Sequence, residues 1–387
     1  MTKSEKFVAD ICAMSFLPFW SFPSPVGKKG NELCDLLVVC QNIIIIFSIK
    51  DIAPSNHQDE KVVYDRWVKK AITESVSQIY GAESYISKVD KIHLKDSTHA
   101  VTLPPKGKRI VYRVAIAFGS KNQYPLPTGD FGKGYVSVFD EESTQVILKE
   151  LDTITDFTNY LTAKQKFSEN NTIVVPYEID FLAIYLEAGL SFDKYKDVVL
   201  FGNNSLWAIY IRSVEYKQWK KDIEVSYIWD IMIQSFYHNN MKPDMTVEQR
   251  ESLEAVFRLI NLEPRINRVE LGLILENAHK TKVKARMMMP LGEAEHAYLF
   301  MPLNDKNWKS KEAELGLRCI VARAEFPSAK KIIGVAIGSY SKKEITFDVH
   351  YLDMPTIDEE FVKNANSIRE EFGYFKNIRQ KHSSQMR

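Results

Sequence analysis

The chain has 387 residues, which is long enough for two domains that each bury a core of their own. A content of 45% hydrophobic and 26% charged residues is ordinary for a soluble globular protein. The net charge of +1 excludes a globally basic surface, so any surface that binds nucleic acid must be local.

The cysteines and the apolar segments predict a reducing, non-membrane environment. The four cysteines show no C-x-x-C spacing, so we expect buried free thiols: Cys12, Cys34, Cys40 and Cys319. Asp10 interrupts the N-terminal apolar stretch, and no A-x-A site follows it, so no targeting signal is predicted. The longest apolar stretch, Leu36–Phe47, is too short to cross a bilayer. We therefore expect a cytoplasmic protein with no membrane partner.

The first predicted elements are a helix and an ordered loop. Apolar residues recur at helical spacing over Glu5–Leu17, which ends before a proline. The following segment, Pro18–Gly30, is rich in proline, glycine and aromatic residues and is typical of a loop. Lys28 and Lys29 lie in this loop, where we expect them to contact phosphate.

A hairpin follows the loop. The runs Leu36–Val39 and Ile43–Phe47 are rich in valine and isoleucine and too short for helices, so each predicts a buried strand. Gln41 and Asn42 separate the runs, and asparagine tolerates the positive φ that a tight hairpin requires. With these residues in the turn, Leu36 faces Phe47.

The same register brings chemically active side chains together at one end of the hairpin. Asp35 lies opposite Ser48, and Lys50 follows on the same face because strand side chains alternate. Glu32 lies just upstream. Buried charges normally pair or meet a metal, and Mg²⁺ takes one or two protein carboxylates besides water and phosphate oxygens. The alternative is a salt bridge between Asp35 and Lys50 at the edge of the sheet.

These residues carry a resemblance to a known family. The string G-x-E-x-x-D, then a hairpin, then an apolar strand ending in S-x-K, resembles the PD-(D/E)XK nuclease superfamily over roughly Phe7–Phe118. The resemblance implies a restriction-endonuclease-like fold in which Asp35 and Glu32 hold Mg²⁺ or Mn²⁺ and Lys50 assists hydrolysis. Ser48 stands where the family has its second acid, and a hydroxyl is a weaker metal ligand than a carboxylate.

Downstream segments extend this α/β domain. Helical spacing predicts a helix over Asp59–Tyr80 that ends at Gly81. Gln78 on this helix either approaches the site or is solvated, and we expect a solvated side chain. Strands are expected at Lys91–Leu94, Arg109–Phe118 and Tyr135–Phe139. A strand–strand–helix–strand order suits a mixed sheet with flanking helices. The loop Gly129–Gly134 lacks the following helix of a phosphate cradle, so we expect a hairpin loop.

A helical region, Glu142–Phe167, closes the N-terminal domain, and a fresh helix is predicted near Asp152. The polar segment Ser168–Thr172 is typical of a linker, so we expect domains over residues 1–168 and 169–387. Glu178 and Asp180, just beyond it, are expected at the surface.

The second domain is expected to be α+β and is similar to no family. Helices are predicted to about residue 262, with a sub-boundary near residue 240 and one helix at Val247–Leu262. Antiparallel strands should then follow at Ala297–Met301, Leu317–Ala324, Ile332–Ser339 and Ile345–Tyr351. Arg265 and Arg268 lie in one basic run and Lys280–Arg286 forms another; each run indicates either phosphate contact or a solvated helix face.

The leading hypothesis is a Mg²⁺- or Mn²⁺-dependent nuclease that cuts DNA rather than RNA, with a role in restriction or phage defence by analogy with the family. The C-terminal region would select the substrate, a partner protein or a second copy of the chain. The alternative is a non-catalytic nucleic-acid-binding or scaffold protein that keeps a degenerate nuclease core. Asp35, Lys50, Glu32 and Ser48 are the residues that decide between them.

Overall fold

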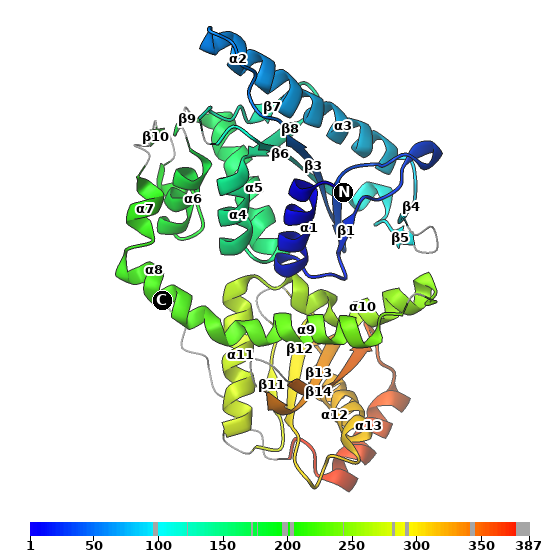
Figure 1. Cartoon of the computed structure of the whole chain (residues 1–387). Coiled ribbons are helices and arrows are strands. Elements are labelled where there is room, and N and C mark those ends of the chain that lie inside the picture. The colour runs from blue at the N-terminus through cyan, green and yellow to red at the C-terminus, as the bar shows by residue number, and fades with distance from the viewer. Residues whose placement is uncertain are drawn as a thin grey trace. The chain divides into compact units, whose positions relative to one another are not determined.

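The computed structural model (Figure 1) describes residues 1–95, 100–121, 123–171, 173–175, 177–195, 200–201, 205–242, 244–280, 283–290, 294–340 and 345–376. The chain forms two compact units. Unit 1 contains Met1–Glu224 and Ile233–Val269, and unit 2 contains Val225–Met232 and Glu270–Arg387. The division predicted after residue 168 falls inside unit 1. Within the described ranges, no helix combines the length and the apolar character needed to span a membrane.

Unit 1 is built on a six-stranded mixed sheet with the strand order β1-β2-β3-β6-β8-β7. Its strands are β1 (Ser21–Pro23), β2 (Leu36–Cys40), β3 (Ile43–Asp51), β6 (Ile110–Phe118), β7 (Gly129–Asp130) and β8 (Tyr135–Phe139). The first three strands are antiparallel neighbours, whereas β3, β6 and β8 run parallel. A mixed sheet with flanking helices is therefore confirmed for this unit.

The β2–β3 hairpin has the predicted register. Leu36 pairs with Phe47, Cys40 pairs with Ile43, and Gln41 takes the positive φ of the turn at 53°. All five residues of β2 are buried, and so are the central residues of β3. Because both faces of the hairpin are covered, the strands are continuously apolar instead of alternating.

One face of the sheet is covered by a long helical segment that connects β3 to β6. It comprises α2 (Glu60–Trp67), a π-helical turn (Val68–Thr73) and α3 (Glu74–Ile86). The N-cap Asp59 accepts hydrogen bonds from the backbone amides of Lys61 and Val62. The predicted end at Gly81 is wrong: the helix continues to Ile86, since the buried Ala82 and Ile86 extend its apolar face.

Three helices cover the opposite face: α1 (Lys3–Ser15), α4 (Glu141–Glu150) and α5 (Ile154–Asn170). Phe47 of β3 stacks on Phe16 and Phe157 there, with ring centroids 6.5 and 6.2 Å apart. Thr153 caps α5 through the Asp156 amide, which confirms the predicted helix start.

The loop between β7 and β8 is a hairpin loop, as predicted. Asp130 Oδ1 accepts hydrogen bonds from the amides of Gly132 and Gly134 at 2.6 and 3.0 Å, so the aspartate organises the turn.

Short ribbons and helices complete unit 1. They are β4 (Lys91–His93) with β5 (Ala100–Thr102), β9 (Ile173–Val174) with β10 (Leu200–Phe201), α6 (Glu178–Glu187), α7 (Leu206–Tyr210), α8 (Val214–Asp222), the part of α9 (Tyr227–Asn240) from Ile233 onward, α10 (Val247–Leu262) and the start of α11 (Arg265–Lys280). The helix Val247–Leu262 has its predicted bounds.

Glu178 and Asp180 of α6 are buried, which corrects the prediction that they lie at the surface. Glu178 pairs with the buried Lys164 and accepts a hydrogen bond from Tyr160. Asp180 Oδ1 accepts the Trp207 amide at 2.8 Å. Both carboxylates therefore hold helices together inside unit 1.

Unit 2 contains a four-stranded sheet in the order β11-β12-β13-β14, with α12 (Lys311–Glu325) and α13 (Glu359–Phe372). Its strands are β11 (Arg286–Met288), β12 (His296–Pro302), β13 (Lys331–Tyr340) and β14 (Ile345–Asp353). Two predictions were wrong here. Leu317–Ala324 belongs to α12, and β12 and β13 run parallel because this helix connects them. Leu315, Cys319 and Ala322 bury one face of the helix at spacings of four and three residues, a pattern that a strand prediction overlooked.

Candidate functional site

The candidate site lies where β3 ends and β2 begins. Positions 44 and 46 of β3 face the apolar layer under α3, so Ser48 and Lys50 follow on that same side. Asp35 lies two residues before Leu37 of β2, which faces the same apolar layer, so Asp35 lies on that side of the sheet as well. The Ile49 amide donates to Asp35 Oδ2 at 2.5 Å, which fixes the carboxylate beside the end of β3.

Burial dominates the electrostatics of this site. Asp35 is 7% exposed and Ser48 is fully buried. Burial raises the pKa of Asp35 from 3.8 to about 6, while the Ile49 amide and the Lys50 ammonium oppose that rise. Asp35 and Lys50, both within the described ranges, form no direct ion pair. The predicted alternative of a salt bridge is therefore absent at contact distance, although the two charges influence each other.

Glu5 is a site residue that the sequence analysis missed. The negative charge of Glu5 raises the pKa of Asp35, and its effect is larger than that of the negative charge of Glu32. Glu5 lies in the first turn of α1, where its carboxylate accepts the Thr2 amide at 2.7 Å. The T-x-x-E capping box at Thr2–Glu5 was the available signal, since it places a carboxylate at the start of the helix.

Ser48 is held by Gln78, so the alternative in which Gln78 approaches the site is the one that the structure has. Ser48 Oγ donates to Gln78 Oε1 at 2.9 Å, and Gln78 is partly buried on α3. The prediction that Gln78 is a solvated side chain is therefore wrong. The amide of Gln78 stands beside the position at which the family has its second acid.

The oxygen donors of the site suit a hard divalent cation that takes only a few of its ligands from the protein. Within the described ranges, no group of three or more His, Cys, Asp or Glu side chains is arranged to hold a metal. Mg²⁺ needs only one or two protein carboxylates. The buried Asp35 supplies one, and the carboxylates of Glu5 and Glu32 lie near enough to raise its pKa. Glu32 itself is exposed.

The four predicted phosphate-binding cations divide into two classes. Lys28 and Lys29 are exposed on a 3-10 turn, Lys28–Gly30, in the loop that precedes Asp35. Arg265 and Arg268 are 4% and 0% exposed, which corrects the prediction that they meet phosphate. Arg265 pairs with Asp152 at 2.9 Å, and Arg268 donates to backbone carbonyls of its own unit. The second basic run includes residues 281 and 282, which lie outside the described ranges.

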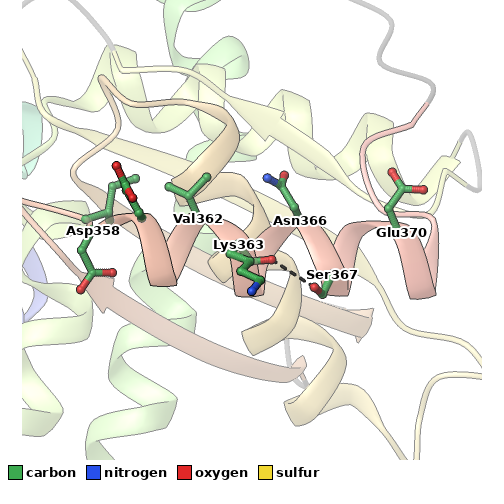
Figure 2. A pocket seen from close by; sticks show the side chains of 8 residues that line it. Asp358, Val362, Lys363, Asn366, Ser367 and Glu370 are labelled. Carbon is green, nitrogen blue, oxygen red and sulfur yellow. Dashed lines mark hydrogen bonds between the residues drawn. The ribbon is translucent and has the colours of Figure 1, made fainter.

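A hollow of about 680 Å³ lies elsewhere, on unit 2. Figure 2 shows that its side chains come from α13 and the segment before it, including Asp358, Lys363 and Glu370. The one hydrogen bond drawn runs from the Ser367 hydroxyl to the Lys363 carbonyl within the helix. Because a single helical segment supplies the lining, this hollow presents no converging catalytic groups, and the Asp35 site stays the candidate.

Comparison of the chain with protein-family models, with curated proteins and with solved structures found no match. The resemblance to the PD-(D/E)XK superfamily therefore depends on the residues at the β2–β3 hairpin.

Proposed function

We propose that unit 1 hydrolyses a phosphodiester bond of nucleic acid, DNA rather than RNA, with Mg²⁺ or Mn²⁺. The observation that carries this proposal is a buried carboxylate beside an ammonium group with which it forms no ion pair. Burial without a neutralising partner is costly, so such groups are typical of sites that act on a charged ligand. The order of β2, β3, the α2–α3 segment and β6 also supports it, because the restriction-endonuclease-like fold requires strand, strand, helix and strand in that sequence.

Each residue has a distinct role in this mechanism. Asp35 is ionised above its pKa of about 6, and its carboxylate would hold the cation together with Glu5 or Glu32. A bound divalent cation supplies a water of lowered pKa and neutralises the phosphate. Lys50 donates to a phosphate oxygen and stabilises the charge that develops in the transition state. Ser48 is not a metal ligand in this scheme. Its hydroxyl donates a hydrogen bond to Gln78 and fixes that side chain beside the site.

A second candidate function is a non-catalytic nucleic-acid-binding or scaffold protein. The specific observation in its favour is that Ser48, in place of the second acid, has its hydroxyl committed to Gln78. Loss of one metal-binding carboxylate would leave a nuclease core that binds without cutting.

The test is a cleavage assay on plasmid, linear DNA and RNA with Mg²⁺ or Mn²⁺. Asp35→Ala and Lys50→Ala should each abolish cleavage. Asp65→Ala and Lys61→Ala, which change exposed residues of α2, are matched controls and should cut like the unaltered protein. Cleavage that survives both site substitutions overturns the proposal, and binding of nucleic acid without cleavage favours the second candidate.

The proposed cellular role is restriction or phage defence, by analogy with the family alone. Phage plating on cells that express the protein tests it. Plaque numbers should fall with the unaltered chain and recover with Asp35→Ala. Assembly with a second copy or with a partner protein through the C-terminal region stays a prediction.

A further inference from the structure

A cluster of lysines surrounds the loop that leads into the candidate site. Residues 25–33 form a closed loop in which the Leu33 amide donates to the Pro25 carbonyl at 2.8 Å. Val26 forms β-bridges with both Glu32 and His93, so the loop extends the β4–β5 ribbon. The antiparallel bridge between Val26 and His93 brings Lys28 towards the level of Lys91. Figure 1 shows this blue loop beside β4 and the C-terminal end of α3.

The 3-10 turn Lys106–Lys108 brings further cations to the same place. Lys106 Nζ donates to the Lys88 carbonyl at 3.1 Å, and the buried Arg109 donates to the Ile86 and Val89 carbonyls, so the turn is fixed against the end of α3. We call the whole set the lysine surface. It consists of seven exposed residues: Lys28, Lys29, Lys88, Lys91, Lys95, Lys106 and Lys108.

The lysine surface is positively charged and largely uncompensated. Only Lys106 forms an ion pair with a described residue, at 3.8 Å from Asp90. Two further carboxylates nearby are Glu32 on the loop and Glu248, whose pKa is lowered first by hydrogen bonds to a backbone amide and to Thr246 and last by the charge of Lys91. A chain with a net charge of +1 has therefore concentrated an excess of cations on one surface.

The backbone presents two of these lysines in a fixed position. Lys29 has a φ of 58°, a left-handed conformation that is strained for a non-glycine residue. The Gly27 amide donates to the Asn31 carbonyl at 2.7 Å across the turn and holds this conformation. Strain of this kind persists where the surrounding structure fixes it and is common at ligand-binding loops.

The same loop connects the lysine surface to the candidate site. The Ser24 amide donates to the Asp35 carbonyl at 2.9 Å, and Glu32 lies within electrostatic range of the Asp35 side chain. The loop that carries Lys28 and Lys29 therefore leads directly into the segment that holds Asp35.

We propose that the lysine surface binds the phosphate backbone of nucleic acid and delivers it to Asp35 and Lys50, an inference that rests on the proposed function. Lysine ammonium groups contact phosphates as point charges and do not read base edges, so the contact is independent of sequence. An anionic membrane is the less favoured ligand of this surface. Surfaces that insert into lipid carry several apolar residues beside the cations, and of the large exposed apolar residues in the described ranges only Ile110 adjoins the segments 24–33 and 87–109.

The test is fluorescence anisotropy with a labelled DNA duplex in EDTA, over a series of salt concentrations. The test variant combines Lys28→Gln, Lys29→Asn, Lys91→Gln and Lys108→Gln; asparagine is chosen because it tolerates positive φ. Each lost phosphate contact lowers the slope of log K against log salt by about 0.9, so we expect a slope smaller by about 3–4 and an affinity at least about tenfold lower. A control, Lys149→Gln with Lys166→Gln, changes two exposed lysines of α4 and α5 and should bind like the unaltered protein.

The binding assay separates this inference from the proposed function. Because EDTA removes the cation, duplex binding lost in the test variant supports the lysine surface even where no cleavage occurs. Duplex binding that the test variant retains, with an unchanged salt slope and an unchanged melting temperature, overturns the inference even where cleavage is intact. A third arm uses phosphatidylserine vesicles, and binding to vesicles but not to the duplex also overturns it.

Discussion

Replacing Asp35 with asparagine should stabilise unit 1, and the gain should grow with pH. The substitution keeps an oxygen that accepts the Ile49 amide and removes the buried charge. Burial raises the pKa of Asp35 from 3.8 to about 6, and this difference corresponds to about 3 kcal/mol. Below pH 3.8, folded and unfolded chains both hold the proton. As the pH rises towards 6, only the unfolded chain releases it, so the free energy of unfolding falls and the full penalty is present above about pH 7.

Urea unfolding followed by tryptophan fluorescence, in EDTA, measures the effect. The free energy of unfolding of Asp35→Asn, minus that of the unaltered protein, should increase by about 2 kcal/mol between about pH 4.5 and 7.5. Added Mg²⁺ should stabilise the unaltered protein and leave the variant unchanged, because a ligand stabilises only the state that binds it. A difference that stays level over this pH range would refute the account of Asp35 as a buried carboxylate with a raised pKa.

Three further predictions follow from the packing. Arg265→Leu separates the Asp152 ion pair and should lower the free energy of unfolding by about 3 kcal/mol, while the salt slope of DNA binding stays constant because this guanidinium is buried. Gly119→Ala places a Cβ 2.4 Å from the Ile52 carbonyl oxygen at a φ of 97°, so the variant should be less stable by about 2 kcal/mol or more in thermal unfolding. The control Gly81→Ala places its Cβ in open space on a helix and should be more stable by about 1 kcal/mol. The four buried cysteines, with the pKa of Cys319 raised by burial to about 12, should react with a thiol reagent at pH 8 only in denaturant, and rapid reaction of the native protein would contradict their burial.

The hairpin was predictable because its signals are local. Two short apolar runs separated by Gln41 and Asn42 fix both the strands and their register, since a shift of one residue would turn every side chain to the other face. The position of Asp35 opposite Ser48 follows from that register alone. The helix after β3 was found for the same reason, although its end was missed because the buried Ile86 extends the apolar face beyond a glycine.

Errors arose where contacts distant in sequence decide the environment. Arg265 and Arg268 look like a basic surface in the sequence, yet Asp152 and the carbonyl of Asn261 make them interior residues. Glu178 likewise forms an ion pair inside the protein, with Lys164. In unit 2, the run Leu317–Ala324 has an apolar content that suits either a strand or a helix, and only its packing on β13 decides.

For the same reason Glu5 was missed and Gln78 was expected to be solvated, and the positions of these two residues explain how the site can lack a second acid on β3. A carboxylate at position 48 would be fully buried beside the apolar layer under α3, next to the charge of Asp35, at a cost of several kcal/mol. Serine avoids that cost by donating to Gln78, so a second carboxylate for a cation must come from the rim of the site. Glu5 and Glu32 are less buried carboxylates whose charges act on Asp35, and Glu5 is positioned by the capping box that begins α1. In the proposed mechanism, cation binding at Asp35 would therefore depend on the folding of the first helical turn, a segment distant in sequence from the hairpin that carries the motif.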